Sequence, residues 1–181
     1  MLTNEEKKLS LSIAREAIAE QLGLIGKMLP CPLESVFTES YGLFVSLSRK
    51  GHLRGCIGYI EPYKPLYQSL VDLSRAAAFK DNRFKPVNKE EFPDINIEIS
   101  ILSPLYKVIQ YEEIVIGRDG LYIKHPRGSG LLLPQVATKY NWDRDTFLIE
   151  TCHKAGLHES CLSDEKLIIF RFEALIFSDN M

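Results

Sequence analysis

Isoleucines alternate strictly with polar residues in one segment, and this alternation constrains the fold more than any other feature of the chain. The segment reads Ile95, Asn96, Ile97, Glu98, Ile99, Ser100 and Ile101. Successive side chains of a β-strand point to opposite faces of its sheet, so the pattern predicts a strand with one buried and one polar face. The chain must therefore build a sheet whose isoleucine face packs against other elements.

A β-hairpin is predicted upstream of this strand. Residues 41–48 alternate between apolar and polar side chains, and residues 53–60 form a second apolar run. The turn signal Lys50-Gly51 between the two runs favours a two-residue turn.

The register of this hairpin follows from its turn. With a two-residue turn, Val45 lies opposite Cys56 and Leu47 lies opposite Arg54. Because cross-strand partners share a face, this register places Arg54 and Cys56 on the same side of the hairpin.

Two amphipathic helices are predicted around the sheet. Thr3 and Glu6 have the spacing of a capping box, and the apolar stripe that follows ends near Gly23. Pro65 suits a first helical turn, and apolar residues then recur at helical spacing until about Lys80.

Further elements follow in the C-terminal part. They are a hairpin over residues 121–133 with a loop tip at 126–130, a helix starting at Pro134, a second helix capped by Asn141 or Asp143 and ended by Gly156, and a last strand over residues 167–177. Helices and strands are mixed without regular β-α-β alternation. We therefore predict an α+β fold, with a mixed or mainly antiparallel sheet and packed helices, as one domain over residues 1–181.

The composition excludes several classes of protein. The net charge of −2 does not favour general nucleic-acid binding, although the basic loop near Lys124 and Arg127 keeps it as a weaker alternative. The sequence has no signal peptide and no apolar stretch long enough to cross a membrane, so we expect a cytoplasmic protein. Its four cysteines are then expected to be reduced thiols.

The segment Leu53-Arg54-Gly55-Cys56-Ile57-Gly58 is the strongest candidate for a functional site. Arg54 places a permanent positive charge two residues from the thiol of Cys56, and a nearby guanidinium stabilises a thiolate. Gly55 and Gly58 allow a ligand or another backbone to approach closely. These features indicate anion binding or thiol chemistry.

The same hexapeptide also has a purely structural interpretation. Cys56 can be a small core residue packed beside Val45, since free cysteine is among the most buried residue types. In that case Arg54 needs a carboxylate partner, and Gly55 and Gly58 serve a turn or a bulge.

Two further segments contribute candidate residues. Asp81 and Arg83 follow the second helix and form either an anion pocket or a local hydrogen-bonded turn. Glu98, on the polar face of the isoleucine-rich strand, is a candidate general base or a partner for Arg54, and solvent exposure is the simpler alternative.

Metal and cofactor chemistry is not indicated. Cys152, His153, His158 and Cys161 are residue types that bind zinc, but they lack the spacings of zinc motifs, and Cys152 is expected to pack inward instead. The common nucleotide, hydrolase and metalloprotease motifs are missing, so we expect neither a metal nor a cofactor.

Several segments together resemble one protein family. They are residues 53–58, Asp81-Asn82-Arg83-Phe84, residues 98–103, Asp119-Gly120-Leu121, residues 130–137, Trp142-Asp143, Phe147-Leu148 and residues 152–157. In these segments the chain resembles the AMME syndrome candidate family, also called AmmeMemoRadiSam system protein A, over nearly its whole length. It departs from that pattern at Asn82, where members often have proline, and at Cys161, near which they often have tryptophan.

The resemblance implies an α+β fold of two interlocked lobes and an association, by gene neighbourhood, with a Memo-like protein and a radical SAM protein. It implies no established catalytic mechanism. Two functions are therefore open. One is an enzyme that acts on a small anionic substrate, with Cys56 and Glu98 catalytic and with Arg54, Gly55, Gly58, Asp81 and Arg83 binding the substrate. The other is a non-catalytic binding or adaptor module that works with the two partner proteins.

Overall fold

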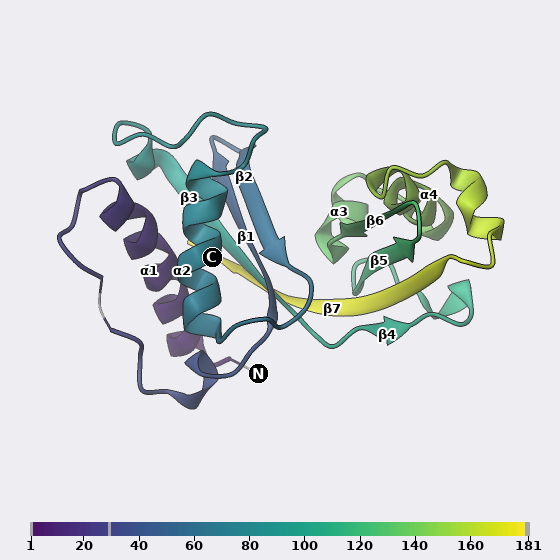
Figure 1. Cartoon of the computed structure of the whole chain (residues 1–181), viewed down its shortest axis with the longest axis horizontal. Helices are drawn as coiled ribbons and strands as arrows, with labels where there is room; N and C mark the ends of the chain where they lie inside the picture. Colours follow the sequence, from purple (N-terminus) through teal and green to yellow (C-terminus); the bar gives the residue numbers. More distant parts are fainter. Residues whose placement is uncertain (1, 29, 180–181) are drawn as a thin grey trace. The chain divides into compact units, whose positions relative to one another are not determined.

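The computed structural model describes residues 2–28 and 30–179, which form two compact units (Figure 1). Unit 1 comprises the chain up to Leu102 and again from Leu175, and unit 2 comprises Ser103–Ala174. Within the described residues, no helix has the length and apolar character needed to cross a membrane.

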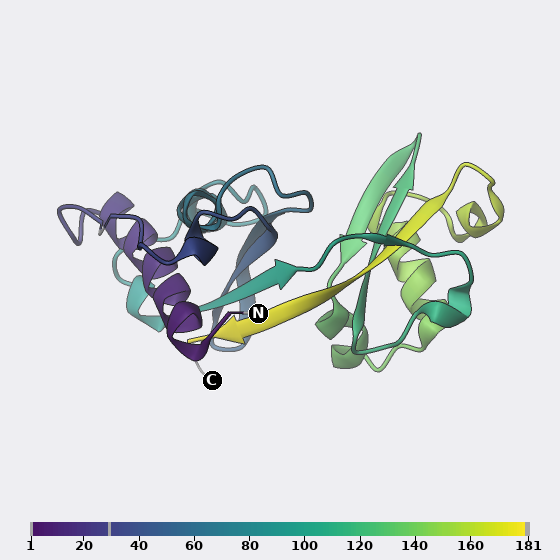
Figure 2. The ribbon, with the colours of Figure 1, turned by 90° about the horizontal axis from the view of Figure 1, so that it is seen from below.

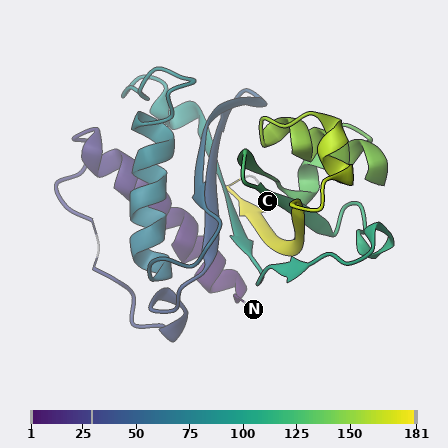
Figure 3. The same cartoon turned by 45° about the vertical axis from the view of Figure 1, so that its right-hand side comes forward.

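Unit 1 is an antiparallel sheet with two helices on one face. Its elements are α1 (Asn4–Gln21), η1 (Ser35–Phe37), β1 (Gly42–Arg49), β2 (His52–Tyr59), α2 (Leu66–Phe79), η2 (Phe92–Asp94) and β3 (Ile95–Leu102). Strand β1 pairs with both β2 and β3, and the order β2-β1-β3-β7 leaves β2 at the edge. Figure 3 shows α1 and α2 side by side against this sheet. The predicted α+β fold is confirmed.

The core of unit 1 lies between the sheet and the two helices. Leu43, Val45 and Leu47 of β1 are fully buried, as are Ile97 and Ile99 of β3. Their alternation buries one face of the sheet against α1 and α2, as the sequence pattern predicts.

The helix boundaries follow their capping residues. Thr3 and Glu6 form the predicted capping box, in which the Glu6 N–H donates to Thr3 Oγ1 over 3.2 Å and the Thr3 N–H donates to Glu6 Oε2 over 2.7 Å. Pro65 is the N-cap of α2 rather than a first-turn residue, and Lys80 is its C-cap. The predicted end of α2 is therefore confirmed, and its start moves by one position.

The turn of the β1–β2 hairpin was predicted correctly, but the register was not. Lys50 and Gly51 have φ of 51° and 79°, which are the two positive values of a type I′ turn. A β-bulge next to this turn adds one residue to β2, so Leu47 lies opposite Gly55 instead of Arg54. The predicted pairing of Val45 with Cys56 is wrong for the same reason.

Unit 2 is a small antiparallel sheet with its own helices. Its elements are β4 (Tyr106–Lys107), η3 (Tyr111–Glu113), β5 (Asp119–His125), β6 (Gly128–Leu132), α3 (Pro134–Lys139), α4 (Arg144–Lys154), η4 (Glu159–Ser163) and most of β7 (Ile168–Ser178). Strand β5 pairs with β6 and β7, and β4 also pairs with β7. Figure 2 shows α3 and α4 beside the β5–β6 hairpin.

The β5–β6 hairpin is tighter than predicted. His125 pairs with Gly128, so Gly128 and Gly130 belong to the strand and not to the loop tip. Both glycines pack under the end of α4, where an added Cβ would lie 2.2 Å from the carbonyl oxygen of Ala155 at Gly128 and 2.4 Å from the Ala155 nitrogen at Gly130. These close approaches explain the two glycines, because any larger side chain would push α4 away.

The remaining helix predictions for unit 2 are confirmed. Pro134 begins α3, and Asp143 caps α4 by accepting the Thr146 N–H over 2.8 Å. Gly156 follows α4 with φ of 71°, the left-handed value that favours glycine after a helix.

Replacing Gly55 by alanine is expected to destabilise unit 1. Gly55 faces α2, and an added Cβ would lie 2.1 Å from the carbonyl oxygen of Ala77, which is backbone and cannot rotate away. We expect Gly55→Ala to lower the free energy of unfolding by about 2–3 kcal/mol in urea titrations. Gly26→Ala is the control, since nothing lies within 4 Å of its added Cβ, and its effect should stay within about 0.5 kcal/mol. Equal stabilities of the two variants would contradict this prediction.

Candidate functional site

A thiol, a hydroxyl and a carboxylate form one row across three strands of unit 1. Ser46 of β1 lies opposite Cys56 of β2 on one side and opposite Glu98 of β3 on the other. The Ser46 hydroxyl donates to Cys56 Sγ over 3.2 Å. The neighbouring pair Leu47 and Gly55 faces α2, so the row lies on the other face of the sheet. The structure thus brings two of the predicted residues, Cys56 and Glu98, to one face.

Ser46 was not identified from the sequence. In the sequence, Ser46 stands out only as a polar residue in the alternating run before the turn. Because the bulge shifts β2 by one residue, Ser46 takes the place beside Cys56 that the predicted register gave to Val45. All three side chains of the row are half-buried.

Two polar side-chain atoms beside this row are buried without a hydrogen-bond partner among the described residues. Ser100 is 1% exposed, and its hydroxyl has no such partner. The same holds for Oδ1 of Asn96, two residues before Glu98 on the same strand. A buried polar atom without a partner costs free energy, so these atoms mark places where a bound molecule or water would be stabilised.

Gly58 has a structural reason to be glycine. It lies opposite Phe44, and an added Cβ would lie 2.3 Å from the Phe44 ring. The two glycines of the hexapeptide thus serve opposite faces of the hairpin: Gly55 accommodates α2, and Gly58 accommodates an aromatic ring.

Arg54 is held by an internal carboxylate. Its Nε and Nη2 donate to the two carboxylate oxygens of Glu91 over 3.1 and 2.8 Å. Its guanidinium also lies 6.0 Å from the ring centroid of Phe84. The side chains of Arg54 and Glu91 are only 16% and 10% exposed. Two-pronged bonds of this kind orient a guanidinium strongly, so Arg54 is fixed in place.

Glu91 was missed by the sequence interpretation, although a local signal was present. Asn88 and Glu91 have the spacing of a capping pair just before η2. In the structure, the Asn88 N–H donates to Glu91 Oε1 over 3.1 Å, and the Glu91 N–H donates to Asn88 Oδ1 over 2.9 Å. Only the tertiary structure shows that the Glu91 carboxylate also binds Arg54.

Asp81 and Arg83 fix the backbone of Cys56. Asp81 Oδ2 accepts the Cys56 N–H over 2.9 Å, and Arg83 Nη2 donates to the Cys56 carbonyl oxygen over 3.2 Å. Arg83 in turn donates to both carboxylate oxygens of Asp81, through Nε over 2.9 Å and Nη2 over 2.7 Å. The predicted local turn is confirmed, since the Arg83 N–H donates to Asp81 Oδ1 over 3.2 Å. The turn thereby supplies the hydrogen-bond acceptor for the Cys56 N–H at the open edge of β2.

These contacts determine the ionisation of both carboxyl groups. The hydrogen bonds from Arg83 hold the pKa of Asp81 far below its usual range, although burial opposes them. The hydrogen bonds from Arg54 lower the pKa of Glu91 against the same opposing effect. Both groups are therefore anions at neutral pH, and each neutralises one guanidinium of the site.

Within residues 2–28 and 30–179, no three His, Cys, Asp or Glu side chains are grouped so that they could hold a metal ion. Cys152 and Cys161 are buried together in unit 2, with their sulfur atoms 2.8 Å apart.

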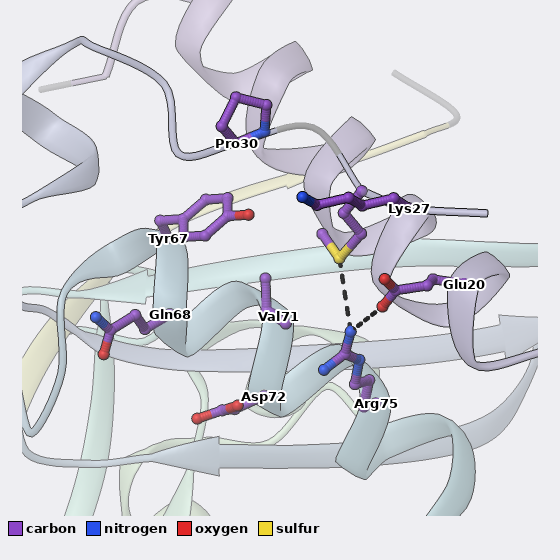
Figure 4. A pocket seen from close by; sticks show the side chains of 9 residues that line it. Glu20, Lys27, Pro30, Tyr67, Gln68, Val71, Asp72 and Arg75 are labelled. Carbon is purple, nitrogen blue, oxygen red and sulfur yellow. Dashed lines mark hydrogen bonds and ion pairs between the residues drawn. The ribbon is translucent and has the colours of Figure 1, made fainter. Parts of the chain in front are cut away.

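A pocket of about 470 Å³ lies between the end of α1, the following loop and α2 (Figure 4). Arg75 lies in it and is paired with Glu20, and its Nη2 also contacts the Sδ atom of Met28 over 3.7 Å. The charge of Arg75 is therefore already neutralised, while Lys27 adds a second basic side chain to the lining.

Comparisons with known proteins identify the family. The AMMECR1 family model matches residues 11–177, which includes the hexapeptide, Asp81, Arg83, Glu91 and Glu98. This chain belongs to the AMMECR1 family. The family predicted from the hexapeptide and its companion segments is thereby confirmed.

Proteins similar to this chain come from several organisms. A protein of Methanothermobacter thermautotrophicus is 43% identical over 99% of this chain and 97% of its own. A protein of Methanocaldococcus jannaschii is also 43% identical, over 99% of this chain and 92% of its own. The crystal structure of an uncharacterised protein of Pyrococcus horikoshii superposes with a TM-score of 0.91 at 36% identity, and covers 98% of this chain and 93% of that one. The family and fold are thus shown, and the names of these relatives state no activity.

Replacing Asp81 by asparagine is expected to destabilise unit 1 in a pH-dependent way. The buried carboxylate accepts bonds from Arg83 and from the edge of β2, so we expect Asp81→Asn to lower the free energy of unfolding at pH 7 by about 2–3 kcal/mol. Because the folded-state pKa of Asp81 is lowered, this contribution is present above the unfolded pKa of about 4 and shrinks as the pH falls below it.

The control for this prediction is Asp72→Asn. Asp72 pairs with Lys64 on the surface, with both side chains more than 40% exposed, so its loss should cost less than about 1 kcal/mol. Urea titrations of both variants between pH 3 and pH 7 measure the difference. A constant gap between Asp81→Asn and the wild type over this range would refute the assignment.

Proposed function

We propose that this protein acts as an enzyme on a small molecule bound at the polar face of the unit 1 sheet, with Cys56 as its reacting thiol. The row of Cys56, Ser46 and Glu98 supports this proposal. It combines a nucleophile, a hydrogen-bond donor directed at the sulfur, and a carboxylate that can accept a proton.

The hydrogen bond from Ser46 supports thiol chemistry at this position. A donor to sulfur stabilises the charged thiolate more than the neutral thiol. The guanidinium of Arg83 donates to the carbonyl oxygen of the same cysteine and fixes the backbone that carries the sulfur. We infer that Cys56 reacts as a thiolate, with Ser46 as its partner.

Glu98 is proposed as the proton acceptor. It is separated from Cys56 by the width of one strand, since Ser46 lies between them. Neighbouring strands lie about 4.8 Å apart, so a molecule that covers Ser46 can touch both outer residues. The unpartnered Ser100 hydroxyl beside Glu98 offers a further polar contact to such a molecule.

Arg54 and Arg83 have a different role in this proposal from the one that the sequence first indicated. Each binds an internal carboxylate with two hydrogen bonds, so we infer that they chiefly position the backbone around Cys56. One atom of Arg54 can still donate a hydrogen bond to an anionic substrate. This atom is Nη1, which is buried and has no hydrogen-bond partner among the described residues. A cytoplasmic location belongs to the same proposal, because a reacting thiol needs a reducing compartment.

The reactivity of Cys56 towards iodoacetamide tests this proposal. At pH 7 we expect Cys56 to be alkylated at least tenfold faster than the exposed Cys31 of the same chain, as followed by peptide mass spectrometry over time. Ser46→Ala should remove most of this difference, because the sulfur loses its donor. A Cys56 that reacts no faster than Cys31 in the folded protein would exclude an activated nucleophile.

A second candidate is a non-catalytic binding module that works with Memo-like and radical SAM partner proteins. It is supported by the internal pairing of Arg54 and Arg83, which accounts for both arginines of the site without a substrate. In this case we expect the purified chain to form a complex with a purified Memo-like or radical SAM protein in size-exclusion chromatography. Cys56→Ser should leave that complex intact, whereas no complex at low or moderate salt would count against the module.

A further inference from the structure

The buried cysteines of unit 2 form a pair that the proposed site does not use. Cys152 lies in the last turn of α4 and is fully buried, and Cys161 lies in η4 and is 1% exposed. Their Sγ atoms are 2.8 Å apart. A disulfide bond measures about 2.05 Å, so a displacement of less than an ångström would join the two atoms.

The elements that carry the two sulfurs are held independently. The end of α4 is fixed against β6, where Gly128 and Gly130 let the backbone of Ala155 approach closely. On the other side, the Tyr111 hydroxyl donates to the carbonyl oxygen of Leu162 in η4 over 3.1 Å. Because both elements are fixed, the sulfur atoms stay within reach of each other.

Asp164 fixes the far end of η4. It is the C-cap of this element, and its Oδ2 lies 3.2 Å from Nε2 of His125 on β5. The His125 Nδ1 accepts the Arg127 N–H over 3.1 Å, so the ring is oriented with Nε2 as the donor to Asp164. The segment after Cys161 is therefore tied to the sheet of unit 2.

We propose that Cys152 and Cys161 are a redox pair that closes to an intramolecular disulfide when the protein meets a peroxide. Such a bond would join the end of α4 to η4 and stabilise unit 2. It would leave Cys56 in unit 1 as a thiol that reacts separately.

The reaction balances with hydrogen peroxide as the oxidant. One thiolate attacks a peroxide oxygen, the O–O bond breaks, and a sulfenic acid and hydroxide form. The second thiol displaces the sulfenic oxygen as water, the S–S bond forms, and its proton and that of the first thiol end on the two waters. The two sulfurs lose two electrons in total, and the peroxide gains them.

The environment of the two sulfurs makes their oxidation slow. Burial, together with the hydrogen bond to Cys161, raises the pKa of the Cys152 thiol to about 12. The Cys152 thiolate is therefore rare at neutral pH, which slows any attack by this sulfur on the peroxide. Because both sulfurs are buried, the reaction needs a brief local opening of η4 and is expected to be slow.

The experiment uses the full chain with Cys31→Ser and Cys56→Ser, so that only the buried pair remains. After incubation with hydrogen peroxide, we expect an intact mass lower by two hydrogens and one cross-linked peptide that joins Cys152 to Cys161. The oxidised protein should melt roughly 5 °C higher than the reduced protein in calorimetry, and a denaturant plus a thiol reductant should reverse both changes.

The matched control adds Cys161→Ala to the same background and should show neither the mass loss nor the cross-link. If that variant does not fold, the peptide map of the parent protein decides the question alone. Oxygen additions on either sulfur without a cross-link, or two thiols that remain fully alkylatable after denaturation, would overturn the proposal.

Discussion

The candidate site of unit 1 depends on the buried carboxylate of Asp81. Strand β2 lies at the edge of its sheet, and Asp81 binds the N–H that this edge presents at Cys56. The same carboxylate holds Arg83, which returns to the carbonyl oxygen of Cys56. One anion thus closes the strand edge and anchors the segment after α2, whose later residue Glu91 binds Arg54. Its neutralisation by Arg83 is what makes its burial tolerable.

This arrangement separates the structural residues of the hexapeptide from those available for chemistry. Arg54, Gly55 and Gly58 each satisfy a contact of the fold: an ion pair, the close approach of α2, and the ring of Phe44. The sulfur of Cys56 faces away from the helices and meets Ser46 instead. An ordinary packing position would surround a thiol with apolar side chains, as unit 2 does with Cys152. The two cysteines are therefore expected to differ in reactivity, because Cys56 has a hydrogen-bond donor beside its sulfur and Cys152 lies in an apolar core.

The sequence predicted local features well and long-range partners poorly. The alternation of isoleucines, the Lys50-Gly51 turn and the Thr3–Glu6 capping box were all confirmed, because each depends on residues close together in the chain. The hairpin register failed at one bulge, whose extra residue no sequence pattern marked, and this error put Val45 in the place of Ser46. Glu91 was missed because its local capping spacing does not reveal a partner 37 positions away.

By itself, the sequence determined the family, the α+β class and the choice of Cys56 and Glu98 as candidates, since these follow from residue types and short spacings. The tertiary structure alone decided which groups meet. It placed Ser46 between the two candidates, gave Arg54 and Arg83 internal carboxylate partners, and brought Cys152 and Cys161 of unit 2 into contact. The reason is physical: a charge or a sulfur acquires its chemistry from neighbours within a few ångströms, and chain folding sets those neighbours independently of their separation in sequence.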